Sequence, residues 1–140
     1  MELTLGITTP LVMEMPAGLD ADARGAIQTA LGTVLWYMEN EKGDAALLEE
    51  AVTAYRAALT EHTQDRVPLE WAATLGNEGV ALLTLAGRTN DPARARQALE
   101  QVTLAEATMR SGGHIPWAEN FAGQIPAAQA LVDRLSGGQP

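Results

Sequence analysis

The sequence repeats itself with a period of 47 residues, and this repeat constrains the fold more than any other feature. The identical pairs are Ala26/Ala73, Gly32/Gly79, Leu35/Leu82, Asp44/Asp91, Ala46/Ala93, Ala51/Ala98 and Ala58/Ala105. Both copies contain a helical pattern, a capping aspartate and a second helical pattern. A fixed period of this length indicates a helical-repeat solenoid, in which stacked helix pairs bury a continuous core.

The composition favours helices over strands. The 140 residues include 25 alanines and 18 leucines, against 7 valines, 4 isoleucines and 6 aromatic residues. Alanine and leucine are strong helix formers, whereas the β-branched and aromatic residues that favour strands are scarce. The length suits one domain, and the hydrophobic content of 46% is too high for a disordered chain. We therefore expect a single all-α domain.

Hydrophobic spacing and capping residues predict five helices. They cover about residues 22–41, 45–62, 69–86, 92–110 and 117–135. The first helix is expected to bury one apolar face, made of Ile27, Leu31, Val34, Leu35 and Met38. Asp91 followed by Pro92 is a strong signal for a helix start. Pro126 lies inside the last segment and is expected to kink or split it.

Breaks in these patterns divide the chain into a head segment, a repeat domain and a tail. The head segment is residues 1–19, the repeat domain is residues 20–135 and the flexible tail is residues 136–140. Within the domain, the repeats cover about residues 22–67 and 68–114, and a capping helix lies in 115–135. The head segment is rich in apolar residues and contains Pro10 and Pro16. We expect an extended strap that packs on its own chain or on a second copy.

Motifs in the two copies resemble tetratricopeptide repeats. The first copy reads Leu31-Gly32-x2-Leu35 and then Ala51-x3-Tyr55-x2-Ala58, and the second reads Glu78-Gly79-x2-Leu82 and then Ala98-x3-Val102-x2-Ala105. The stretch from Arg66 to Leu82 is similar to R-x-P-L-x-W-A-x-T-x-x-N-x-G-x-A-L, the pattern of a long-repeat variant common in bacterial arrays. Glu78 and Val102 depart from the family's apolar and aromatic choices. The period of 47 also exceeds the usual length of about 34 residues.

The resemblance implies a short right-handed solenoid of two helix hairpins and a C-terminal capping helix. In that family, small residues let the helices approach closely, and the aromatic residue fills the space between them. The first helix of each pair lines a concave surface that binds a protein partner. The resemblance therefore implies protein binding without catalysis, as in a bacterial adaptor or scaffold.

Helical phase places a set of candidate binding residues on that concave surface. They lie on the first and third expected helices and comprise Thr29, Thr33, Trp36, Tyr37, Asn77, Val80 and Thr84. Asn77 matches an asparagine common in the family, and its side chain can pair with a peptide backbone or with a neighbouring helix. No lysine or arginine shares this face, which argues against a clamp for a C-terminal carboxylate.

The chain is acidic, with 18 acidic and 9 basic residues and a net charge of −9. Because nucleic-acid surfaces are basic, we expect no nucleic-acid partner. Residues 1–70 contain 12 acids and 4 bases, a net charge of −8, which fits either a solvated acidic surface or an acidic end that prefers a basic protein or peptide as partner. The sequence contains no apolar run long enough to span a bilayer, no signal peptide and no cysteine, so we expect a cytoplasmic protein with no membrane partner.

The sequence contains no recognisable catalytic motif. His62 and His114 lack the spacing of metal ligands and are expected at the surface. The acid pair Glu39/Glu41 fits a solvated helix face better than a pair of catalytic carboxylates. Trp117 is expected to pack against the preceding repeat. We therefore expect no metal, no cofactor and no enzyme activity.

Two further classes of protein stay open. The first is a self-assembly module that forms a homodimer through the head segment or the solenoid ends. The second is a small-molecule enzyme on a compact helical bundle, which would need a deep pocket with converging polar groups. The contacts distinguish the folds, since solenoid helices contact mainly their neighbours in sequence. A closed four-helix bundle brings the first helix against the fourth.

Overall fold

A computed structural model describes residues 18–42 and 45–137, and all the regular structure in these ranges is helical. The helices are α2 (Ala21–Lys42), α3 (Ala45–Glu61), α4 (Pro68–Thr89), α5 (Pro92–Ser111), α6 (Ile115–Ala122) and α7 (Ile125–Leu135). The prediction of an all-α protein is confirmed. The predicted head segment, apart from its last two residues, and the last three residues of the predicted tail lie outside the described ranges.

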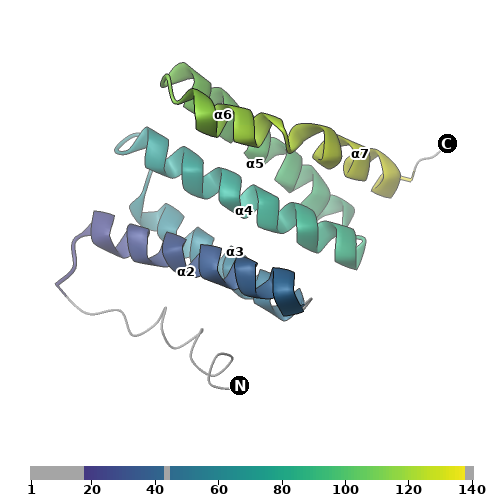
Figure 1. Cartoon of the computed structure of the whole chain (residues 1–140), viewed down its shortest axis with the longest axis horizontal. Coiled ribbons are helices and arrows are strands. Elements are labelled where there is room, and N and C mark those ends of the chain that lie inside the picture. Colours follow the sequence, from purple (N-terminus) through teal and green to yellow (C-terminus); the bar gives the residue numbers. More distant parts are fainter. Residues whose placement is uncertain (1–17, 43–44, 138–140) are drawn as a thin grey trace.

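Packing is strongest between helices that follow one another in the chain. Helix α2 packs on α3, and α4 packs on α5, which makes two hairpins; α3 also packs on α4, and α5 packs on both α6 and α7. Figure 1 shows α2, α4 and the α6–α7 pair stacked in a front layer, with α3 and α5 behind them. Helices α2 and α4 touch at few points. The two hairpins are therefore joined mainly through α3 and α4.

Burial follows the 47-residue repeat. In α2 the buried residues Gly25, Gly32, Leu35 and Glu39 correspond to the buried residues Ala72, Gly79, Leu82 and Ala86 of α4. In α3 and α5 the corresponding buried pairs are Leu48/Ala95, Ala51/Ala98, Ala54/Gln101, Tyr55/Val102 and Ala58/Ala105. The two hairpins therefore share this set of buried positions, although α4 also buries Thr74 and Ala81, whose counterparts Ile27 and Val34 are exposed.

Each hairpin contains a close contact between a glycine of its first helix and a large side chain of its second. A Cβ atom at Gly32 would lie 2.7 Å from the ring of Tyr55, and one at Gly79 would lie 2.9 Å from Cγ1 of Val102. Both contacts need a residue without a side chain, because real Cβ atoms keep a longer distance. The glycines of the repeat thus set the spacing of the helices within each hairpin.

The start of α5 confirms the predicted cap. The Asp91 carboxylate accepts hydrogen bonds from the backbone N–H groups of Ala93 and Arg94, at 3.1 and 3.2 Å. Pro92 occupies the first turn, where its missing N–H group leaves no bond unmade. The equivalent Asp44 of the first repeat lies outside the described residues.

The structure divides the predicted capping helix in 115–135 into α6 and α7, which confirms the split expected at Pro126. The break falls at Gly123 and Gln124, and Pro126 lies in the first turn of α7. In an uninterrupted helix, Pro126 would lack a backbone donor and its ring would collide with the preceding turn. At the start of a new helix, the same residue costs nothing.

The predicted apolar face of α2 is also partly wrong. Leu35 is buried, but Ile27 and Val34 are 45% and 53% exposed. The buried residues of α2 instead include Gly25, Gly32 and Glu39, which a search for apolar spacing does not detect. The true buried face is therefore rotated around the helix axis from the predicted one.

Two groups predicted to be solvated lie inside the protein. The Glu39 side chain is fully buried and forms an ion pair with Arg88 of α4. His62 is 6% exposed, and its Nε2 atom lies 3.3 Å from the backbone oxygen of Asp22. The ion pair with Arg88 offsets part of the cost of burying the Glu39 carboxylate, while Nδ1 of His62 has no hydrogen-bond partner in the described chain. His114, by contrast, is exposed at the start of α6, as predicted.

A second buried acid lies between the hairpins. Glu78 of α4 is 2% exposed and accepts hydrogen bonds from Nε of Arg56 at 2.7 Å and from Nε2 of Gln101 at 3.0 Å. Each of these bonds partly offsets the cost of removing the carboxylate from water. Arg56 belongs to the first hairpin, so this group links the two repeats.

Candidate functional site

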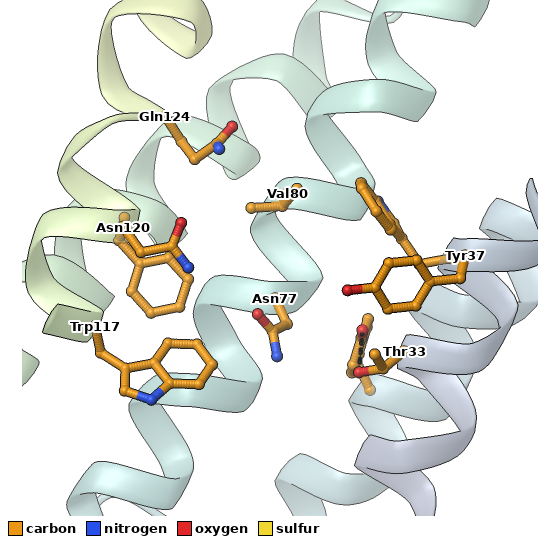
Figure 2. A pocket seen from close by; sticks show the side chains of 10 residues that line it. Thr33, Tyr37, Asn77, Val80, Trp117, Asn120 and Gln124 are labelled. Atoms are coloured by element: carbon orange, nitrogen blue, oxygen red, sulfur yellow. Dashed lines mark hydrogen bonds between the residues drawn. The ribbon is translucent and has the colours of Figure 1, made fainter. Parts of the chain in front are cut away.

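Helices α2, α4 and α6 enclose a groove of about 400 Å³ in the front layer (Figure 2). Its walls are formed by aromatic, amide and small side chains: Thr33, Trp36, Tyr37, Tyr55, Asn77, Val80, Trp117, Asn120, Phe121 and Gln124. We refer to this set as the front groove. It lies between the helices that make few direct contacts with one another.

Five of the seven predicted binding residues line the front groove, namely Thr33, Trp36, Tyr37, Asn77 and Val80. The other two do not. The Thr29 hydroxyl forms a 3.0 Å hydrogen bond with the hydroxyl of Thr74, which joins α2 to α4. The Thr84 hydroxyl donates to the backbone oxygen of Val80 at 3.2 Å, within its own helix. Both threonines therefore have internal hydrogen bonds and lie outside the groove.

Asn77 presents an unpaired carboxamide to the groove. Figure 2 shows its side chain extending from α4 into the space between Trp117 and Thr33. Its side chain has no hydrogen-bond partner within the described chain, so the alternative of a bond to a neighbouring helix is not observed. A carboxamide offers two donors and one acceptor, and all of them are available to a ligand.

The α2 wall is aromatic. The rings of Trp36 and Tyr37 meet edge to face, with centroids 5.5 Å apart and an interplanar angle of 84°. Tyr37 is 63% exposed, so one side of its ring is open to a ligand. Behind it, the hydroxyls of Thr33 and Tyr55 form a 2.9 Å hydrogen bond. Burial raises the pKa of the Tyr55 hydroxyl, while its hydrogen bond with Thr33 acts in the opposite direction.

The opposite wall comes from α6 and was missed by sequence reasoning. The rings of Trp117 and Phe121 pack against each other, with centroids 5.4 Å apart. Phe121 lies on Gly76 of α4, where a Cβ atom would be 2.3 Å from the ring. This contact holds α6 against α4 and brings Asn120 to the groove. Trp117 also packs against the core around Phe121, in agreement with its predicted role.

One sequence signal could have identified the α6 wall. Trp71 and Trp117 open matching helical patterns 46 residues apart. If α6 is taken as the first helix of a third repeat, Trp117 and Asn120 lie close to the face of α6 that corresponds to the Asn77 face of α4. The position of α6 itself depends on the contact between Phe121 and Gly76, which no local pattern encodes.

The front groove carries no formal charge. Tyr37 and Tyr55 are its only ionisable lining residues, although the whole chain has a net charge of −9. The unpaired amides are those of Asn77, Asn120 and Gln124, since none of them forms a side-chain hydrogen bond within the described chain. The groove thus combines aromatic walls with neutral hydrogen-bonding groups and suits an uncharged ligand segment.

A smaller cavity of about 250 Å³ lies near the start of α2 and is lined by Asp22, Ala26, His62, Val67 and Glu70. One of these lining residues, Asp22, forms an ion pair with Arg66 at 2.6 Å. In residues 18–42 and 45–137, no group of three or more potential ligand side chains is arranged to hold a metal ion. Helices long and apolar enough to cross a membrane are likewise absent from these residues.

Comparison of the chain with protein-family models gave no match. The curated proteins and the solved structures contained no match either.

Proposed function

We propose that this chain is a non-catalytic protein–protein interaction module, built as a short solenoid of two tetratricopeptide-like hairpins closed by α6 and α7. Three observations support the proposal. Packing is strongest between consecutive helices, burial follows the 47-residue repeat, and both hairpins contain the same glycine contact. The front groove lies on the first helices of the hairpins, where such repeats bind their partners.

The observation that carries the function is the set of unpaired amides between aromatic walls. An extended peptide presents N–H and C=O groups along its backbone, and the carboxamides of Asn77, Asn120 and Gln124 can pair with both kinds of group. The open ring of Tyr37 and the ring of Trp117 can hold an apolar or aromatic side chain between them. We infer that the groove binds an extended peptide segment.

The charge distribution narrows the kind of peptide. Because no charged residue lines the front groove, a charged side chain placed there would lose water without gaining a partner. Residues outside the groove give the chain its acidic surface, which attracts basic residues on either side of the bound segment. The expected ligand therefore has an uncharged centre and basic flanks. The cytoplasmic adaptor role rests on the sequence features described above.

The groove is a poorer match for an enzyme. General acid–base and nucleophilic catalysis need ionisable groups in hydrogen-bond contact, and the only ionisable lining residues are two tyrosines. One of them, Tyr55, already shares its hydroxyl with Thr33. Neutral amides and aromatic rings orient and hold a ligand, and we assign them that role.

A peptide-display selection tests the proposal. A library of random ten-residue peptides is selected against the immobilised full chain, and the Kd of the best binders is measured by fluorescence anisotropy. Replacing Asn77 with alanine should weaken binding by about 1–2 kcal/mol, or roughly 5–30-fold, because a hydrogen-bonding group at the centre of the interface is lost. Thr84→Ala is the matched control, since Thr84 is on the same helix but outside the groove.

The peptide selection has three distinct outcomes. Weakening by Asn77→Ala and no change for Thr84→Ala support the proposal. Equal affinities for the wild-type chain and the Asn77→Ala variant would show that the peptides bind elsewhere. A selection that returns no binder would also count against a peptide groove.

A further inference from the structure

The outward side of α2 carries an uncovered apolar stripe. Ile27 and Val34 are 45% and 53% exposed, and Tyr37 is 63% exposed. Ala30, between them, is exposed as well. The spacing of three, four and three residues places all four on one side of the helix. Such a row of apolar residues on a surface usually marks a place where another chain segment packs. We call these four residues the outer stripe.

The internal repeat shows how the equivalent face of α4 is used. Thr74 and Ala81, 47 residues after Ile27 and Val34, are 1% and 0% exposed. Ala81 belongs to a core cluster with residues of the first hairpin, and Thr74 is hydrogen-bonded to Thr29 of α2. At these two positions the α4 face is covered by the first hairpin, whereas Asn77 and Thr84, the equivalents of Ala30 and Tyr37, are only partly buried. The α2 face has the same place in its repeat but lacks such a cover among the described residues.

We propose that the apolar head segment, residues 3–15 of the same chain, covers the outer stripe of α2. This segment directly precedes α2, as the first hairpin precedes α4. It contains seven large apolar residues: Leu3, Leu5, Ile7, Leu11, Val12, Met13 and Met15. The outer stripe shares only Tyr37 with the front groove, and the inference does not depend on the function proposed for that groove.

The entry to α2 allows the chain to turn back along the helix. Gly18 has a φ of 93°, a left-handed conformation that favours glycine and produces a turn. The next residues are held in place, because Arg24 donates to the backbone oxygen of Leu19 at 2.5 Å and Asp20 caps the helix through the N–H of Ala23 at 2.8 Å. From Ala21 to Tyr37 the helix rises about 24 Å, whereas thirteen extended residues span about 43 Å. The head segment is thus long enough.

Charge favours the head segment over a second copy as the occupant. Residues 1–70 contain 12 acids and 4 bases, a net charge of −8, so two copies that join through α2 would bring like charges together. The head segment brings only two acids, Glu2 and Glu14, near its ends. It adds apolar area to an apolar stripe at a small electrostatic cost.

The absence of native cysteine makes a direct test possible. Val34→Cys places a single thiol on the outer stripe, and Thr103→Cys places one at an exposed position of α5 as the matched control. The rate of reaction with a thiol reagent is measured in the full chain, with the native head and with the head carrying Leu5→Ser and Ile7→Ser. A site that is covered nine-tenths of the time reacts about ten times more slowly than a free one.

If the head segment covers the stripe, the serine substitutions should raise the rate at Val34→Cys by roughly tenfold and leave the rate at Thr103→Cys unchanged. A head carrying Thr4→Ser and Thr8→Ser should behave like the native one. An unchanged rate at Val34→Cys would overturn the proposal. A rate that rises on dilution, together with a doubled mass by light scattering, would assign the stripe to a second copy and also overturn it.

Discussion

Replacing Gly76 with alanine tests how α6 is attached to α4. The structure places Phe121 directly on Gly76, and a Cβ atom there would lie 2.3 Å from Cζ and 2.4 Å from Cε1 of the ring. Carbon atoms in contact are normally about 3.5–4.0 Å apart, so the ring must move by more than about 1 Å. Phe121 is 1% exposed and packs against Trp117 and the buried cluster around it. The substitution should therefore displace α6.

Gly87→Ala is the matched control for this experiment. Gly87 lies on the same helix, and a Cβ atom there would meet only Leu131, at an ordinary distance of 4.0 Å. Both substitutions gain helix propensity, up to about 1 kcal/mol each, so this gain nearly cancels in the comparison. What remains is the overpacking at Phe121, which typically costs about 1–3 kcal/mol. We expect Gly76→Ala to be less stable than Gly87→Ala by that amount.

Urea titrations monitored by circular dichroism measure the unfolding free energies of the two alanine variants. A thermal scan should show melting temperatures that differ by roughly 3–5 °C per kcal/mol. Adding Phe121→Leu to Gly76→Ala should recover part of the loss, because the smaller side chain relieves the contact. Equal stability of the two alanine variants would refute the close contact between α6 and α4. The same result would remove the α6 wall of the front groove.

Three further predictions follow from the ion pairs and from the aromatic wall. Arg56→Ala leaves the buried carboxylate of Glu78 without its positive partner and should lower the unfolding free energy by about 1–3 kcal/mol in urea titrations, more than Glu78→Leu does. The hydrogen bond from Arg24 lowers the pKa of the Glu61 carboxyl, so its contribution to stability is present above the unfolded pKa of about 4.3 and is lost as the pH falls through the folded value. Melting between pH 7 and pH 3 should therefore show a weaker acid dependence in Glu61→Gln than in the wild-type chain, and equal slopes would contradict this. Tyr37→Ala should weaken peptide binding by about 1 kcal/mol or more while changing the melting temperature little, because the ring is 63% exposed.

Much of the helical framework could be predicted from the sequence because its signals are local. The start of α5 follows from Asp91 and Pro92, whose cap bonds are formed between residues two and three positions apart. The alignment of Gly32 with Gly79 in the repeat marks two positions at which the helices of a hairpin come close together. Five groove residues could be predicted because they lie on equivalent faces of α2 and α4, and helical periodicity identifies such faces.

The errors arose where burial depends on distant partners. The buried face of α2 contains Gly25 and Gly32, which have no side chain to count as apolar, and Glu39, which looks solvated. Glu39 can be buried because Arg88 lies beside it, 49 residues later in the chain. The α6 wall was missed for the same reason, since it depends on the fit of Phe121 to Gly76.

The ion pairs between the two hairpins have a consequence for how the repeats are aligned. Alanine and glycine faces are smooth, and by themselves they would let one hairpin slide by a helical turn of about 5.4 Å along the next at little cost. Arg56 with Glu78, and Arg88 with Glu39, cross this interface with a buried carboxylate in each pair. A slip of one turn would separate both carboxylates from their partners. Each unpaired buried charge would cost several kcal/mol of stability. The charges therefore lock the register that the small residues leave free.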